Sequence, residues 1–150
     1  MQTVQTENEQ KKRYLRGYRT HVRRINRIEA DLEELREMRL SMSMNNDGMP
    51  QGSGQSDLSG YAAELDEQER NLIRERYERI QTYKDIAKGI KKLNSENEKD
   101  VLFYRYISGL AWWEIAEKMS FSERQIFRIH GKALVHFKLP EDFKDVSECQ

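Results

Sequence analysis

Apolar residues recur at helical spacing over two long stretches of the chain. The first stretch starts at Tyr14 and proceeds in alternating steps of four and three, which places one apolar seam on one side of a helix expected over about residues 8–42. Leu15 and Val22 widen the seam near its N-terminal end. The seam positions, with His21 and Arg39 as polar exceptions, are Tyr14, Tyr18, His21, Ile25, Ile28, Leu32, Leu35, Arg39 and Met42. A helix of this kind needs a partner that covers its seam.

The second helical pattern extends over residues 61–93. Leu65 and Leu72 form a row beside its main apolar face, which we expect to consist of Ile73, Ile80, Tyr83, Ala87 and Ile90. Residues 41–60, between the two patterns, are rich in Gly, Ser and Asn and predict a flexible linker. The two helices then either pack against each other as an antiparallel, coiled-coil-like hairpin or dimerise through the same stripe. A flexible linker favours the hairpin because it keeps the internal partner at high local concentration.

Shorter helices are predicted after residue 93. Ser95 and Glu98 form an S-x-x-E capping box that opens one helix, which we expect to end at Ser108 and Gly109. A second short helix is expected over residues 112–119, and a third begins at a further capping box, Ser122 with Gln125, and continues to about Phe137. The expected domains are thus a helical hairpin over 1–93, a helix-turn-helix over 94–139 and an acidic tail over 140–150.

The last two helices have the pattern of a helix-turn-helix, in which the crossing requires a small residue midway along the first helix. Ala116 supplies the small residue, and Phe121 fills the turn. Ser120 occupies the turn position where glycine is usual, because a left-handed conformation is favoured there. The apolar positions of the expected three-helix core are Leu102, Tyr106, Ile115, Met119, Ile126 and Ile129.

The stretch VLFYRYISGLAWWEIAEKMSFSERQIFRIHGKAL resembles the helix-turn-helix of sigma factor region 4. The chain as a whole is similar to a family of phage and prophage proteins related to the late-gene activators ArpU and RinA. The resemblance implies a phage-encoded transcriptional regulator that activates late genes, such as those for packaging and lysis. It would act by binding upstream DNA or by contacting RNA polymerase. We do not expect a complete sigma factor, because no remaining segment has the length or aromatic content of a promoter-melting domain.

By the same resemblance, the helix that opens at Ser122 enters the major groove of double-stranded DNA. Arginine can bridge guanine and glutamine can bridge adenine, while Glu123 either accepts from cytosine or favours the positive helix end. Lys132 and Lys138 are placed for phosphates. The expected DNA-binding residues are Ser122, Glu123, Arg124, Gln125, Arg128 and Lys132. Of the paired tryptophans Trp112 and Trp113, we expect one ring on the core and the other on the surface.

The net charge is zero, but the charges are unevenly distributed. Eight Lys and Arg residues and no acidic residue lie between Lys11 and Arg27, whereas residues 141–150 hold four acidic residues and one lysine. The basic stretch has two interpretations, a solvated helix face or a second patch that touches the DNA backbone. Neutrality of the whole chain does not exclude DNA, because binding depends on local potential.

Composition and motifs give little support to other functional classes. A 37% hydrophobic and 35% charged chain with two prolines suits a helical protein, and the single cysteine, Cys149, can form no internal disulfide. No apolar run reaches the roughly 20 residues of a membrane span, and no signal peptide is evident, so we expect a protein of the bacterial host cytoplasm. The histidines His21, His130 and His136 are scattered, and no catalytic motif occurs, so no enzymatic activity, metal or cofactor is expected.

Two other interpretations remain open. Small terminase subunits of DNA-packaging machines also combine a helix-turn-helix with coiled-coil helices and assemble into rings. A helical protein-interaction module, in which the hairpin is the active surface, is the second. A homodimer is compatible with the regulator, so mass in solution separates a monomer or dimer from a ring.

Overall fold

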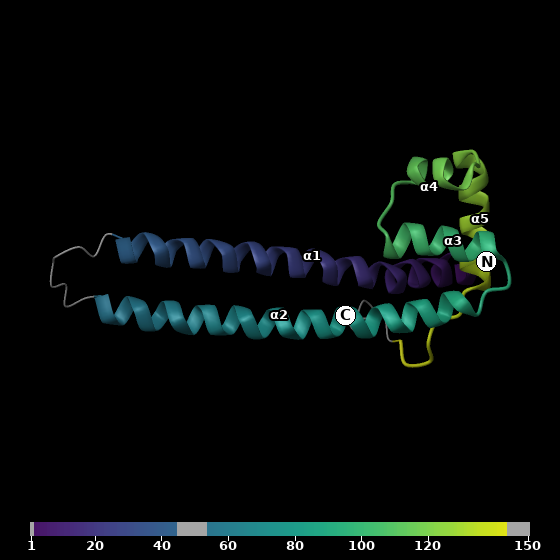
Figure 1. Ribbon diagram of the computed structural model, residues 1–150. Coiled ribbons are helices and arrows are strands. Elements are labelled where there is room, and N and C mark those ends of the chain that lie inside the picture. Colours follow the sequence, from purple (N-terminus) through teal and green to yellow (C-terminus); the bar gives the residue numbers. More distant parts are fainter. Residues whose placement is uncertain (1, 45–53, 144–150) are drawn as a thin grey trace. The chain divides into compact units, whose positions relative to one another are not determined.

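The computed structural model describes residues 2–44 and 54–143, and the regular secondary structure of that part is entirely helical (Figure 1). This confirms the expected all-helical class. A π-helical turn, η1, continues directly from α3. The elements are α1 (Gln2–Met44), α2 (Gly54–Lys91), α3 (Glu96–Leu102), η1 (Phe103–Ile107), α4 (Trp112–Met119) and α5 (Glu123–His136). In the described residues, no helix combines the length and the apolar character that crossing a membrane requires.

Both long helices extend further than the sequence pattern predicts. The helix α1 ends at Met44 and α2 begins at Gly54, so residues 41–44 and 54–60, which we expected in the flexible linker, are helical. Low helix propensity costs at most about 1 kcal/mol per residue for glycine and less for serine or asparagine. Adding such residues to an existing helix avoids a new nucleation step. The centre of the expected linker, residues 45–53, lies outside the described residues.

Contacts divide the chain into two compact units. One comprises Met1–Thr20 together with Ile80–Gln150 and is called here the composite unit, while the other, the central unit, is His21–Arg79. This division falls within α1 and α2, and the expected domains 1–93, 94–139 and 140–150 stay a prediction. The first turns of α1 and the last turns of α2 pack with the predicted helix-turn-helix segment instead.

The larger core of the composite unit joins both ends of the chain. Leu15 of α1 and Ile86 of α2 are fully buried there, against Leu134 of α5, and in Figure 1 the purple N-terminal end of α1 lies beside α3 and α5. Leu102 and Tyr106, which we expected to close the helix-turn-helix core, belong to this cluster instead. The full set is Leu15, Ile86, Ile90, Leu93, Leu102, Tyr106, Ile107, Ala133, Leu134 and Phe137.

In the central unit, ion pairs link α1 to α2. His21 Nδ1 lies 2.8 Å from Glu75 Oε2, and Arg76 donates to Glu29 Oε1 at 3.0 Å. Ile25 and Leu32 of the expected seam are buried. His21, which interrupts the apolar seam, therefore has a polar partner on α2.

The apolar face expected on α2 is wrong over most of its length. Ile73 is 68% exposed, and Ile80 and Tyr83 are also exposed, whereas Ile90 is buried as expected. The inward row includes the half-buried Glu75, whose carboxylate is paired with His21. A carboxylate can point inward when it is paired. A search for apolar residues alone therefore misses the row that contains Glu75 and predicts the wrong face of α2.

Candidate DNA-binding helix-turn-helix

The turn between α4 and α5 is built from local backbone bonds. Ser120 adopts a left-handed conformation with φ 58° and ψ 40°, and it is the one non-glycine residue with positive φ in the described chain. Phe121 N–H then donates to the Ala116 carbonyl at 3.0 Å, which closes the end of α4. The position expected to favour glycine therefore does require the left-handed region, and Ser120 adopts it at some steric cost.

A small second core holds α4 and α5 together. Ile115, Ala116 and Ile126 are buried, and Val101 of α3 completes the cluster. Met119, Phe121 and Ile129 pack around it, as expected for residues at the crossing. Three helices thus meet at this core, and Val101 takes the place that we expected Leu102 and Tyr106 to fill.

The N-terminus of α5 is closed by the expected capping box. Ser122 Oγ accepts from the Gln125 backbone N–H at 3.2 Å, and Gln125 Oε1 accepts from the Ser122 N–H at 2.9 Å. Ser122 Oγ also lies 3.2 Å from Gln125 Oε1. Because an adenine-reading glutamine needs its amide oxygen as well as its nitrogen, the side chain of Gln125 serves the cap in this conformation and is not available for bidentate base contact.

The outward face of α5 is basic. Buried residues of this helix are Ile126, His130, Ala133 and Leu134, and Arg124, Arg128 and Lys132 emerge from the opposite side, all exposed. None of these three side chains has a hydrogen bond or ion pair within the described chain. All six expected DNA-binding residues are exposed. Arg124, Arg128 and Lys132 share one face of α5. Ser122, Glu123 and Gln125 lie at its N-terminal cap and first turn.

Gly131 lies on the same outward face, and a Cβ placed on it would meet nothing within 4 Å. Packing within the described residues therefore gives no reason for a glycine in the interior of α5, where it costs roughly 1 kcal/mol relative to alanine. No pattern in the sequence indicated a role for this residue. A bare backbone between Arg128 and Lys132 allows an external partner to approach the helix closely.

An aromatic cluster packs against the buried His130 of α5. Tyr106 Oη lies 2.7 Å from Nε2 of the buried His130, and the Trp112 ring meets the same imidazole edge-on at 4.7 Å. Burial, followed by the positive charges of Lys12, Arg105 and Arg16, lowers the pKa of His130 to about 4. The imidazole is therefore neutral at physiological pH. Trp113 is exposed, so the tryptophans divide between core and surface as expected.

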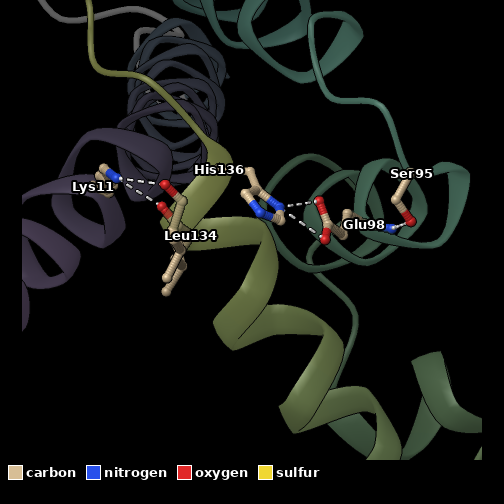
Figure 2. A network of polar contacts seen from close by, with 6 residues as sticks. Lys11, Ser95, Glu98, Leu134 and His136 are labelled. Carbon is tan, nitrogen blue, oxygen red and sulfur yellow. Dashed lines mark hydrogen bonds and ion pairs between the residues drawn. The ribbon is translucent and has the colours of Figure 1, made fainter.

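The C-terminal end of α5 is held by side chains that are distant from it in the sequence and were not expected there (Figure 2). Lys11 Nζ donates to the Leu134 carbonyl at 2.8 Å, and His136 Nδ1 lies 3.0 Å from the Glu98 carboxylate. A cation at the last carbonyls satisfies backbone acceptors and opposes the negative end of the helix dipole. Ser95 caps α3 by accepting from Glu98 N–H at 3.4 Å. The Glu98 side chain thus turns to His136 rather than completing the expected capping box.

Within the described residues, no three His, Cys, Asp or Glu side chains gather as a metal site. No protein-family model, curated protein or solved structure matches the chain.

Proposed function

We propose that this protein is a phage-encoded transcriptional regulator that reads double-stranded DNA with α5. The observation that carries the proposal is the outward face of α5, where Arg124, Arg128 and Lys132 are exposed and unpaired within the described chain. Some exposed cations of the central unit are paired instead, Arg76 with Glu29 and Arg36 with Glu69. Unpaired cations on one helix face match the charge and hydrogen-bonding requirements of a DNA groove.

The roles of the three cations differ by their position on α5. Arg124 and Arg128 lie in the N-terminal half of the helix, the part of a recognition helix that contacts base edges, and each presents a guanidinium able to bridge guanine O6 and N7. Lys132 lies one turn later and is suited to a phosphate. Gln125 acts by fixing the first turn of α5 through its cap. Glu123 favours the positive end of the helix.

We further propose that α4 and α5 form a sigma region 4-like helix-turn-helix and that α1 and α2 form an antiparallel hairpin. The left-handed Ser120, the small Ala116 and the buried Ile115 and Ile126 support the first assignment. Ion pairs support the second, because His21 pairs with Glu75 whereas Arg36 pairs with Glu69. From His21 to Arg36 along α1 the partner number falls from 75 to 69, the direction of an antiparallel pair, although Glu29 between them pairs with Arg76.

Activation of late genes follows from the resemblance to the ArpU and RinA relatives. In this proposal the protein binds DNA upstream of a late promoter or contacts RNA polymerase in the manner of region 4, and it needs neither a cofactor nor a catalytic residue. Its place of action is the host cytoplasm. A stable monomer or dimer in solution agrees with this role, whereas a ring of many subunits would favour the small terminase alternative.

Selection of bound duplexes from a randomised library tests the proposal. The wild-type chain is expected to enrich one motif, and the Arg124→Ala/Arg128→Ala variant is expected to lose binding to it, because each bidentate pair contributes about 1–3 kcal/mol of discrimination. The matched control is Arg39→Ala/Arg74→Ala, which removes the same charge from exposed positions of the central unit. Unchanged affinity of the α5 variant, with helicity intact, would refute the assignment of α5.

A further inference from the structure

The first turns of α1 form part of the composite unit rather than a free arm. Three residues on one row of this helix, four apart, contact the rest of the unit: Lys11 binds the Leu134 carbonyl, Leu15 is fully buried and Arg19 covers Gly109. A Cβ on Gly109 would lie 2.6 Å from the Arg19 guanidinium carbon. The row therefore fixes the rotation of α1 about its own axis within this unit.

Lys12 and Arg16 follow Lys11 and Leu15 by one residue each and so lie on the neighbouring row of α1. Arg16 is exposed and its guanidinium has no ion pair among the described residues. Lys12 is partly exposed and donates to Glu9 Oε1 at 3.1 Å, so one of the cations is partly neutralised. The row of Lys12 and Arg16 thus carries a net positive charge and lies next to the row of Lys11, Leu15 and Arg19 that holds α1 in the unit.

Arg105 of η1 adds a third cation to the same neighbourhood. Its Nη1 donates to the Leu110 carbonyl at 3.0 Å, and its guanidinium carbon lies 4.3 Å from the Trp112 ring centre. These contacts hold the planar group in one orientation. The Trp112 ring that Arg105 covers lies 4.7 Å from the His130 ring of α5, and Lys11, the residue before Lys12, binds the Leu134 carbonyl at the end of α5. The segments that carry the three cations therefore contact α5 in its C-terminal half.

We propose that Lys12, Arg16 and Arg105, called here the flanking basic surface, bind phosphates of the same DNA duplex whose groove receives α5. The inference rests on the proposed function of α5 and adds a second contact, from an element far away in the sequence. Phosphate contacts orient a protein on a duplex without reading its sequence. The anchored row of α1 supplies the rigidity that such an orienting contact needs, because Lys11, Leu15 and Arg19 hold the helix on the unit.

If this surface binds phosphates, the affinity for DNA should depend on salt concentration in the same way for every DNA sequence. Each neutralised phosphate contributes about 0.9 to the slope of log affinity against log salt concentration. The Lys12→Gln/Arg16→Gln variant is therefore expected to reduce that slope by about 2. Affinity for the selected duplex and for an unrelated duplex should fall by similar factors. Arg105 is left unchanged because it also holds Leu110 and Trp112.

Two further variants make the test specific. Arg39→Gln/Arg74→Gln removes the same charge from the central unit and is expected to leave the slope unchanged. Arg16→Lys keeps the charge and should retain the wild-type slope. Fluorescence anisotropy of labelled duplexes over roughly 50–200 mM salt gives the slopes, and circular dichroism shows that each variant is folded.

The outcomes separate this inference from the proposed function. A smaller slope for Lys12→Gln/Arg16→Gln, with an unchanged slope for the central-unit control, supports the flanking basic surface. If the wild-type chain binds a selected duplex and the α5 variant does not, but Lys12→Gln/Arg16→Gln keeps the wild-type slope, the inference is overturned and the function of α5 stands. If the wild-type chain binds no duplex at all, both fall.

Discussion

Tyr106 Oη and His130 Nε2 lie 2.7 Å apart in the interior of the composite unit and join η1 to α5. Burial raises the pKa of Tyr106 to about 12 and lowers that of His130 to about 4, so both groups are neutral over the physiological range. The position of α5 therefore depends on a neutral imidazole. Protonating it places a charge in the interior beside the cations Lys12, Arg105 and Arg16.

Acid is therefore expected to destabilise the protein through His130. The unfolded chain has a histidine pKa of about 6.5, and the folded value is about 4. Because the folded pKa is the lower one, the stabilisation is fully present above pH 6.5 and is lost as the pH falls toward 4. The free energy of unfolding should drop by up to about 3 kcal/mol in this window. Urea titrations at several pH values measure it.

His130→Gln provides the control, because glutamine can still bond Tyr106 but does not titrate. The pH dependence between 6.5 and 4 should shrink in this variant, whereas the same replacement at His136, which is exposed, should leave the His130 contribution in place. A His130→Gln protein with the full wild-type pH dependence would contradict the assignment.

Ser120→Gly is expected to stabilise the turn between α4 and α5. Serine at φ 58° experiences the steric cost of the left-handed region, on the order of 1 kcal/mol, which glycine avoids. The gain is reduced because glycine also loses more backbone entropy on folding. We expect a net increase of about 0.5 kcal/mol in the free energy of unfolding. Ser120→Val should lower it, since a β-branched residue is poorly tolerated there.

Gly89→Ala is expected to destabilise the composite unit by about 1–3 kcal/mol. A Cβ at this position would lie 2.7 Å from Phe137 Cε2, and Phe137 is almost fully buried, so the ring has little room to move. Thermal unfolding measures the loss. Gly60→Ala in the same helix meets nothing within 4 Å and should instead stabilise by roughly 0.5–1 kcal/mol. Phe137→Leu combined with Gly89→Ala should recover part of the loss.

Gly131→Ala is expected to separate stability from DNA binding. The helix α5 should gain roughly 0.5–1 kcal/mol, because the new methyl group meets no atom of the described residues within 4 Å. If DNA approaches the backbone between Arg128 and Lys132, the same methyl group should weaken binding to a selected duplex. Denaturant titration and anisotropy on one protein preparation give both quantities. A variant that is more stable and binds as tightly as wild type would argue against close approach at Gly131.

Local patterns in the sequence were sufficient for the short helices. The turn at Ser120, the cap at Ser122 and the buried positions Ile115 and Ile126 depend on residues within a few positions of one another. The left-handed turn was expected because a tight crossing requires it. The side-chain cap of α3 by Ser95 was expected for the same local reason.

Contacts between distant residues could not be predicted in this way. Lys11 binds a carbonyl 123 residues away, and Glu98 turns to His136 rather than to the backbone of Ser95. Both interactions depend on how helices pack, which helical periodicity does not specify. The exposed Ile73 shows the same limit, since α2 has more than one apolar row and packing selects among them.

The composite unit has a consequence for the order in which the protein can fold. Translation releases Leu15 from the ribosome well before its partners Ile86 and Leu134, so this leucine has no native core to enter while the intervening chain is made. The core can close only after α5 has emerged. Nascent chains therefore cannot complete this core until synthesis has passed α5. Under the proposed function, a chain that stalls earlier could not present a positioned α5 to DNA.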